Sequence, residues 1–269
     1  MMSDDPARAI DERTWGARRI LTHLGIGLFA GLLSGMFGVG GGVVIVPLLV
    51  LLATYPQRRA TGTSLGAIVP TATVGVIAYA LTQDVAWIPA LILAAGAVVG
   101  AQVGSWLLPK VPVKALQLGF AGFMLAVVVS LFFVVPVRGE PFDLTWVTGA
   151  GLVGLGLITG VLSGLLGVGG GIIVVPALML LFGTSDLIAR GTSLLMMIPT
   201  AISGTIGNIR RGNIDLLGAL LVGVAACTTT ALGAWIAKSI DPFTGNMIFA
   251  VFLVFIAGQI VYRALRRKG

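Results

Sequence analysis

The sequence predicts an all-α polytopic membrane protein made of two homologous repeats, and three observations support this fold class. Of the 269 residues, 57% are hydrophobic and only 10% are charged, whereas roughly a quarter of the residues of a soluble domain carry a charge. The charges cluster between apolar runs of about 20 residues, the length that crosses a bilayer. A glycine-rich segment also occurs twice. These features exclude a soluble enzyme, a secreted disulfide scaffold and a nucleic-acid-binding domain, because the net charge of +7 lies in flanks and loops.

The two repeats align without a gap. Residues 31–47 read GLLSGMFGVGGGVVIVP and residues 160–176 read GVLSGLLGVGGGIIVVP, with 11 of 17 positions identical at an offset of 129. Three shorter matches continue at this offset: Ala60-x-Gly62-Thr63-Ser64-Leu65 with Ala189-x-Gly191-Thr192-Ser193-Leu194, Pro70-Thr71-Ala72 with Pro199-Thr200-Ala201, and Gly104-x-Trp106 with Gly233-x-Trp235. Such a duplication is typical of transporters. The expected organisation is a cytoplasmic N-terminal segment (1–19), a first transmembrane repeat (20–137), an extracytoplasmic linker (138–146), a second transmembrane repeat (147–262) and a cytoplasmic basic tail (263–269).

Each repeat is expected to begin with a broken apolar element, at residues 20–54 and 147–183, interrupted by the sequence GVGGG. The piece after each break, 43–53 or 172–182, has about 11 residues and covers about half of a roughly 30 Å hydrocarbon core. We therefore expect a re-entrant hairpin, although two short helices that cross a thinned region would have the same parity. Three runs long enough to span follow in each repeat: 60–82, 86–108 and 115–137, then 189–208, 214–237 and 243–262.

The lysines and arginines indicate how the repeats are oriented. If each broken element enters and leaves on one side and the termini are cytoplasmic, 14 of the 17 basic residues lie inside, and only Arg138, Arg190 and Lys238 lie outside. If each broken element crosses once, so that the repeats are parallel, the count is 11 inside and 6 outside. Cytoplasmic loops of membrane proteins are enriched in Lys and Arg. The inverted arrangement is therefore favoured.

Stripes of glycine at every fourth position occur in both repeats and predict close helix packing. They are Gly27, Gly31 and Gly35, their counterparts Gly156, Gly160 and Gly164, and also Gly96, Gly100 and Gly104. The same stripes would suit an interface between two copies of the chain, so a homo-oligomer is also an expected arrangement.

The GVGGG breaks predict a binding site for a small anion. Consecutive glycines inside a membrane segment weaken a helix by roughly 1 kcal/mol each, and a break at that depth must line protein or water. The helix that restarts after it presents free N–H groups and a partial positive charge, which bind anions without an ionised side chain. Hydroxyl groups near the breaks can add donors. The candidate substrate-binding residues are Ser34, Gly38, Gly40, Gly41, Gly42, Thr63 and Ser64 in the first repeat, and Ser163, Gly167, Gly169, Gly170, Gly171, Thr192 and Ser193 in the second.

Structural roles are alternatives for the same residues. The glycines could form only a tight turn, the serines before the breaks could hydrogen-bond within their helices, and Thr63 with Thr192 could cap the next helix. Pro70 and Pro199 would kink that helix in both repeats, which suits a gated cavity or shape matching alone.

Other chemistry has no basis in the sequence. The carboxylates outside the N-terminal segment map to loops or span ends, so a carboxylate-based proton relay is not expected. The single histidine, His23, is interpreted as a membrane-interface residue rather than part of a proton relay, and Cys227 as packing. With no H-E-x-x-H and no paired aspartates at mid-membrane depth, neither an enzyme nor a metal or cofactor site is expected. The five tryptophans lie near predicted span ends and are typical of interface anchors.

The doubled pattern G-x-L-S-G-x-x-G-V-G-G-G-x-x-x-V-P, with Gly-Thr-Ser-Leu downstream in each half, resembles the sulfite exporter TauE/SafE family over residues 20–262. This resemblance implies a multi-pass transporter of the bacterial inner membrane that carries a small anion such as sulfite or sulfoacetate. Export is favoured because a cytoplasm-negative potential drives anions outward by about 2.3 kcal/mol per charge per 100 mV. An uptake carrier coupled to protons borne by the substrate, an anion channel and a scaffold subunit without flux are the alternatives.

Overall fold

The computed structural model describes residues 16–133 and 145–266, and within them ten helices form two sets of five. The first set is α1 (Ala17–Phe37), α2 (Gly42–Leu51), α3 (Gln57–Ala80), α4 (Trp87–Leu107) and α5 (Val113–Phe133). The second set is α6 (Trp146–Leu166), α7 (Gly171–Phe182), α8 (Asp186–Ile209), α9 (Leu216–Ser239) and α10 (Pro242–Arg266). Most of the expected N-terminal segment and of the linker lies outside the described residues.

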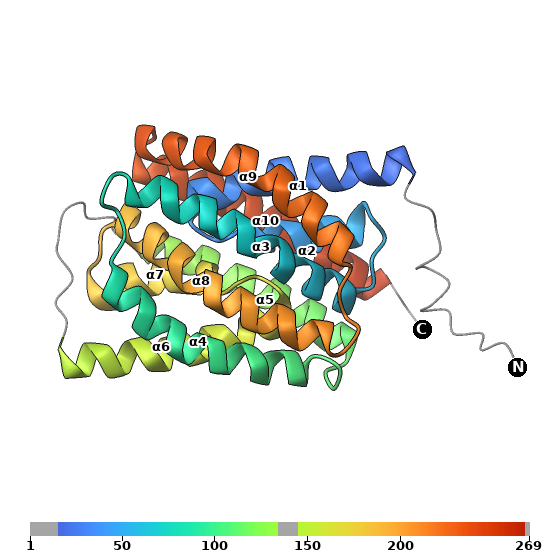
Figure 1. Ribbon diagram of the computed structural model, residues 1–269, viewed down its shortest axis with the longest axis horizontal. Coiled ribbons are helices and arrows are strands. Elements are labelled where there is room, and N and C mark those ends of the chain that lie inside the picture. The colour runs from blue at the N-terminus through green and yellow to red at the C-terminus, as the bar shows by residue number, and fades with distance from the viewer. Residues whose placement is uncertain (1–15, 134–144, 267–269) are drawn as a thin grey trace, which may run out of the picture.

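The all-helical membrane fold is confirmed. Six of the described helices, α1, α3, α4, α6, α8 and α9, are long and apolar enough to cross a membrane. The helices are arranged side by side along the long dimension of the molecule (Figure 1). Described tryptophans lie near helix ends with at least half of their surface exposed, as expected for interface anchors: Trp87, Trp106, Trp146 and Trp235.

The broken elements begin with longer helices than a half-crossing hairpin requires. Helices α1 and α6 each have 21 residues, which is long enough to cross a bilayer. Helices α2 and α7 have only 10 and 12 residues, or about 15–18 Å at 1.5 Å per residue. After α2 the chain reaches Tyr55, whose hydroxyl lies 3.0 Å from the Nε2 atom of His23 in α1. Helix α2 therefore returns toward the end at which α1 begins.

The two sets of helices pack in matching pairs. Helix α1 lies along α9 just as α6 lies along α4, and α3 packs against its counterpart α8. The glycine stripes form the two equivalent contacts, because Gly31 faces the Ala226 carbonyl and Gly160 faces the Ala97 carbonyl. A methyl group at either glycine would overlap with that oxygen. The prediction that these stripes serve close helix packing is confirmed.

Helices α3 and α8 run in opposite directions where they meet. A side chain on Gly204, late in α8, would contact Leu65, early in α3. One on Gly75, late in α3, would contact Leu194, early in α8. These two equivalent helices form the centre of the molecule, between the α1–α9 pair and the α4–α6 pair (Figure 1).

Candidate functional site

Each GVGGG sequence forms a sharp turn that only glycine adopts readily. Helix α1 ends where Gly38 adopts a left-handed conformation with φ 67°, and its N–H donates to the Ser34 carbonyl oxygen at 2.9 Å. Gly40 and Gly41 also have positive φ, 67° and 75°, before α2 restarts at Gly42. Residues other than glycine are strained in this region. We call residues 38–41 the first break.

The second break, residues 167–170, repeats this conformation. Gly167, Gly169 and Gly170 have φ of 74°, 83° and 90°, and the Gly167 N–H donates to the Ser163 carbonyl oxygen at 2.8 Å. Helix α7 then starts at Gly171. The first N–H groups of a helix have no partner within it and bear partial positive charge.

The two breaks lie directly against each other. A methyl group built on Gly42 would lie 2.6 Å from the Gly167 carbonyl oxygen, and one on Gly171 would lie 2.7 Å from the Gly38 carbonyl oxygen. The N-termini of α2 and α7 are therefore brought together from opposite repeats, and no side chain would fit at these contacts. Gly41 and Gly170 are different, because each faces back toward a carbonyl of its own repeat, that of Ala30 or Thr159.

The space between the breaks is filled by apolar side chains from α3 and α8. Methyl groups built on Gly40 and on Gly169 would both overlap with the Cε methyl of Met197, and both approach Ile68. Met197 and Ile68 are fully buried and occupy equivalent positions in the two repeats. An anion that bound between the breaks would have to displace the flexible methionine side chain.

Ser64 and Ser193 connect each repeat to the break of the other. The Ser64 hydroxyl donates to the Gly167 carbonyl oxygen at 2.7 Å, and the Ser193 hydroxyl donates to the Gly38 carbonyl oxygen at 3.0 Å. Both serines are fully buried. Their donors are thus already used to hold the breaks in place.

Thr63 and Thr192 hold the loops that precede α9 and α4. The Thr63 hydroxyl accepts the Asp215 N–H at 3.0 Å, and the Thr192 hydroxyl accepts the Ala86 N–H at 2.9 Å. The hypothesis that these threonines cap their own helices is wrong, because α3 and α8 begin six residues earlier in sequence, at Gln57 and Asp186.

Ser34 and Ser163 are the predicted site residues whose hydroxyl groups remain available. Both side chains are fully buried, and neither hydroxyl oxygen has a hydrogen-bond partner within the described part of the chain. The alternative that these serines hydrogen-bond within their own helices is therefore wrong for this structure. An unbonded buried hydroxyl costs free energy that a ligand can recover.

Arg190 is a buried cation beside the first break that sequence reasoning assigned to an outside loop. It lies within α8 with 4% of its surface exposed, and its Nη1 atom donates to the Met36 carbonyl oxygen at 2.7 Å. Its Nη2 atom lies 3.5 Å from an Asp186 carboxylate oxygen. A methyl group on Gly38 would lie 2.6 Å from the Arg190 Cα atom. A cation at the C-terminus of α1 interacts favourably with the helix dipole.

Thr61 occupies the equivalent position beside the second break. It is fully buried and its hydroxyl has no partner within the described residues, and a methyl group on Gly167 would lie 2.7 Å from its Cα atom. Sequence reasoning missed both residues. The sequence feature that could have identified them is position x of the repeated Ala-x-Gly-Thr-Ser-Leu, which is threonine in the first repeat and arginine in the second.

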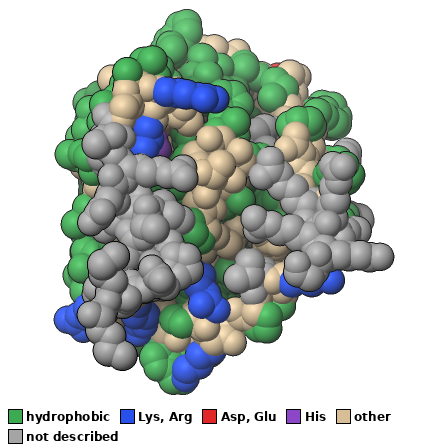
Figure 2. All heavy atoms as spheres, turned by 90° about the vertical axis from the view of Figure 1, so that its right-hand side faces the viewer, with side chains coloured by type: hydrophobic (Ala, Val, Ile, Leu, Met, Phe, Trp, Pro, Cys, Tyr) green, Lys and Arg blue, Asp and Glu red, His purple; other side chains and the backbone are tan. Residues whose placement is uncertain are grey.

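Basic side chains gather at the end of the molecule where α1, α3 and α9 begin, which we call the basic end (Figure 2). Arg19 and Arg59 lie 3.0 and 3.7 Å from the carboxylate of Asp215, and Arg58 donates to the Pro109 carbonyl oxygen at 2.7 Å. At the opposite end Lys238 pairs with Asp84 at 3.7 Å. The charges that the sequence analysis assigned to opposite sides thus lie at opposite ends.

A bundle of membrane-length helices with a duplicated, glycine-broken centre is typical of membrane transporters. The family model described as sulfite exporter TauE/SafE matches residues 4–131 and 152–269. The chain belongs to the TauE/SafE sulfite exporter family.

Curated relatives from both bacteria and an archaeon resemble nearly the whole chain. The chain is 29% identical over 264 residues to "Probable membrane transporter protein YunE" of Bacillus subtilis, covering 89% of this chain and 96% of that protein. It is 30% identical over 239 residues to "Probable membrane transporter protein YdhB" of the same organism, covering 86% and 95%. A "Probable membrane transporter protein MJ0441" of Methanocaldococcus jannaschii is 25% identical over 242 residues, covering 81% and 86%.

Proposed function

We propose that this transporter exports a small sulfur-containing anion, sulfite or an organosulfonate such as sulfoacetate, through the space between the two breaks. One observation supports this most directly: the N-termini of α2 and α7 meet there, and about one turn before each break a serine, Ser34 or Ser163, is buried with a hydroxyl that has no partner among the described residues. Helix N-termini and hydroxyl donors suit an oxyanion. The family description supplies the sulfur chemistry of the substrate.

Arg190 adds a positive charge to one side of this site. Its guanidinium group is held by the Met36 carbonyl and by Asp186 at the first break. A guanidinium binds oxyanions through two parallel hydrogen bonds. Thr61 would supply a hydroxyl at the equivalent position of the second break. The proposed site thus has a guanidinium, paired with Asp186, on one side and a hydroxyl on the other.

We further propose that the two repeats are inverted in the inner membrane, with the basic end and both termini in the cytoplasm. The antiparallel contact of α3 with its counterpart α8 supports this, because equivalent helices run antiparallel when the symmetry axis lies in the membrane plane. The basic end agrees with the bias of Lys and Arg toward the cytoplasm. An outward-driving potential of about 2.3 kcal/mol per charge per 100 mV then favours export of a dianion twice as strongly as that of a monoanion.

The test is anion flux and binding with purified protein in proteoliposomes. Ser34→Ala and Ser163→Ala should each weaken sulfite binding by about 0.5–1.5 kcal/mol, and by more if the lost bond is to a full negative charge. Thr71→Val with Thr200→Val is the matched control, because these buried hydroxyls also form an equivalent pair but already donate to carbonyls of their own helices. Valine at Gly41 is a poorer probe, since φ of 75° strains any side chain there.

The outcomes separate the alternatives. Loss of binding in the serine variants with retention in the threonine variants supports the site between the breaks. Wild-type binding in both serine variants contradicts it and leaves the glycines as turns only. Saturable counterflow of sulfite distinguishes a carrier from a channel, and sulfite uptake that rises with an inward proton gradient favours the uptake carrier.

A further inference from the structure

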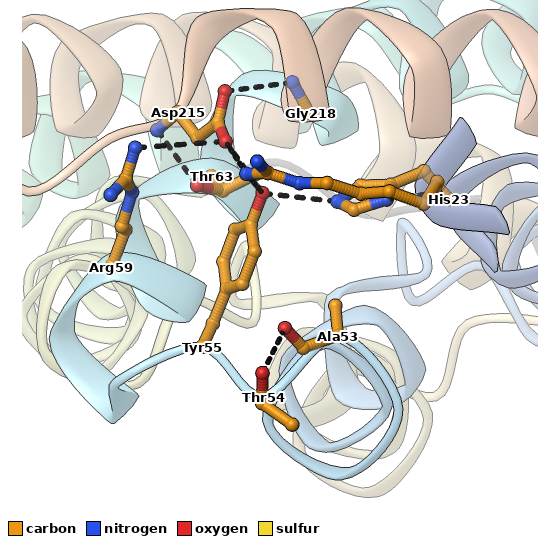
Figure 3. A network of polar contacts seen from close by, with 9 residues as sticks. His23, Ala53, Thr54, Tyr55, Arg59, Thr63, Asp215 and Gly218 are labelled. Carbon is orange, nitrogen blue, oxygen red and sulfur yellow. Dashed lines mark hydrogen bonds and ion pairs between the residues drawn. The ribbon is translucent and has the colours of Figure 1, made fainter. Parts of the chain in front are cut away.

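A buried polar network joins four segments at the basic end (Figure 3). His23 of α1 lies beside Tyr55 of the α2–α3 loop, and the Tyr55 hydroxyl donates to the carboxylate of Asp215, just before α9, at 2.6 Å. Arg19 of α1 donates both to Tyr55 at 3.2 Å and to Asp215 at 3.0 Å. Arg59 of α3 lies 3.7 Å from the same carboxylate oxygen.

His23 is fully buried among other parts of the protein and does not present its side chain at the surface. Its Nδ1 atom lies 2.7 Å from the Arg19 carbonyl oxygen, and its Nε2 atom lies 3.0 Å from the Tyr55 hydroxyl. Both ring nitrogens are therefore engaged in a chain of hydrogen bonds that runs from the Arg19 carbonyl through His23 and Tyr55 to Asp215. We call these four groups the His23 chain.

The His23 chain needs one more proton than its neutral side chains provide. The Arg19 carbonyl and an ionised Asp215 at its two ends only accept hydrogen bonds. Three bonds between four groups require three hydrogens, whereas a neutral imidazole and a phenol supply two. If Tyr55 donates to Asp215, then Nε2 of His23 must donate to Tyr55 while Nδ1 donates to the Arg19 carbonyl.

The protonation states of Tyr55 and Asp215 indicate where this third proton lies. Burial raises the pKa of Tyr55 to about 12, so the phenol keeps its proton. Burial alone would raise the pKa of Asp215, but bonds from the Gly218 N–H and the Tyr55 hydroxyl, with the Arg59 and Arg19 charges, lower it, so the carboxylate is ionised. The remaining proton belongs on the imidazole of His23. Burial and the Arg19 charge oppose this proton, whereas the bond to the Arg19 carbonyl and the Asp215 carboxylate favour it, so the hydrogen bonds of the His23 chain are what retain it.

We propose that the His23 chain is a proton-binding latch, which holds the basic end closed when His23 is doubly protonated and releases it when that proton leaves. Without the third hydrogen one bond of the chain is lost, and Tyr55 no longer ties the α2–α3 loop to both α1 and α9. Closure is thus favoured at low pH and weakened as the pH rises. The latch would make opening at this end proton-dependent for any anion.

At the opposite end, the described residues equivalent to the His23 chain form no such network of titratable groups. At the offset of 129, Arg19, His23, Tyr55 and Asp215 correspond to Thr148, Leu152, Thr184 and Ala86. The equivalent of Arg59 is Ile188. None of these five side chains gains or loses a proton near neutral pH. Thr63 and Thr192, by contrast, accept equivalent backbone N–H groups at both ends. The proton therefore acts on one end of a nearly symmetric molecule.

The protonation state of His23 can be observed directly, because the chain has a single histidine. Protein carrying a histidine-free affinity tag is labelled with ¹⁵N-histidine, reconstituted in nanodiscs, and its ring nitrogens are followed by NMR from pH 5 to pH 8. We expect both nitrogens to be protonated at the acidic end of this range and one to lose its proton as the pH rises. A singly protonated ring throughout the range would overturn the proposal, and this measurement needs no variant.

Variants then test whether the hydrogen-bond chain retains the proton and closes the end. Tyr55→Phe should move the ¹⁵N titration of His23 to lower pH, whereas the control Thr54→Ala should not, because the exposed Thr54 hydroxyl in the same loop donates to the Ala53 carbonyl outside the chain. Equal titrations in the two variants would contradict the proposed role of Tyr55.

Opening is measured at one fixed pH with a cysteine in place of the buried Thr61, in a Cys227→Ala background. Tyr55→Phe should increase the rate of labelling by a water-soluble thiol reagent at least several-fold over Thr54→Ala. Equal labelling rates in the two variants would show that the His23 chain does not hold the basic end closed. Sulfite binding is measured on Tyr55→Phe and Thr54→Ala that keep Thr61, and it reports separately on the proposed function, so failure of one proposal is distinguishable from failure of the other.

Discussion

The contact between α1 and α9 predicts that Gly31→Ala destabilises the protein. A methyl group at Gly31 would lie 2.5 Å from the Thr229 Oγ1 atom and 2.6 Å from the Ala226 Cα atom, whereas carbon atoms in contact are about 3.5–4.0 Å apart. The two helices would have to separate by about 1 Å to restore that distance. Overpacking of this kind costs about 1–3 kcal/mol. Separation would also weaken the 2.7 Å hydrogen bond from Thr229 to the Leu28 carbonyl oxygen.

Gly25→Ala is the matched control on the same helix. Gly25 is exposed, and a methyl group there meets nothing within 4 Å. Alanine is favoured over glycine in a helix interior by about 1 kcal/mol, so this variant should be neutral or slightly stabilised. The two substitutions make the same chemical change and should differ by about 2–4 kcal/mol in the free energy of unfolding.

The assay is thermal unfolding of both purified variants in detergent, followed by tryptophan fluorescence, together with sulfite binding on the same samples. Gly31→Ala should unfold at a lower temperature than wild type and Gly25→Ala should not, and the affinity of Gly31→Ala for the anion should change less than its stability. Equal unfolding temperatures would refute the close α1–α9 contact. Unchanged stability with lost binding would instead assign Gly31 to the site.

Three further predictions concern topology, the site and pH. In a Cys227→Ala background, a single cysteine in place of Asp84 should be labelled by an external impermeant thiol reagent, and one in place of Arg58 should be protected from it. The reverse pattern would contradict the proposed orientation. Arg190→Thr, which makes the two repeats alike at this position, should weaken sulfite binding at least about tenfold, or 1.4 kcal/mol, if one bond to a charged anion is lost; unchanged binding would leave Arg190 as a cap of α1. Asp215→Asn should lower stability at neutral pH. The pKa of Asp215 is lower in the folded protein than its ordinary value, so the ionised carboxylate stabilises the fold. This stabilisation is complete above about pH 4, the ordinary carboxyl range, and is lost as the pH falls through the folded pKa. Parallel stability curves of wild type and variant across acid pH would contradict this.

The sequence was sufficient for the fold class, the family and the turn conformation at the breaks. Consecutive glycines specify positive φ directly, since other residues are strained there, and all six glycines with positive φ at the breaks were among the predicted site residues. Each expected spanning run overlaps one described helix, with bounds that differ by a few residues. Periodicity and composition determine these features locally, so no knowledge of tertiary contacts is needed.

Side-chain partners could not be predicted, because they depend on which distant segments meet. Thr63 reads as a helix cap in sequence, yet its partner is the N–H of Asp215 in another loop. Met197 reads as one apolar residue among many, yet its methyl group lies between the two breaks. His23 lies near the edge of an apolar run and is nonetheless buried, because the α2–α3 loop folds back over it with Tyr55. Each of these contacts joins residues at least 28 positions apart in the sequence.

A backbone that is nearly two-fold symmetric would treat its two ends alike, so any difference between them must come from side chains at equivalent positions. The structure concentrates these differences at two places. Beside the breaks, Arg190 occupies the position equivalent to Thr61, which gives the first break a guanidinium paired with Asp186. At the basic end, His23 and Asp215 stand where the other end has Leu152 and Ala86, which provides a group that can gain or lose a proton. A fixed charge changes how strongly an anion is bound, whereas a titratable group changes which end opens. On the two proposals above, Arg190 would influence the affinity for the anion and His23 the rate at which the basic end opens, while the membrane potential sets the direction of net flux.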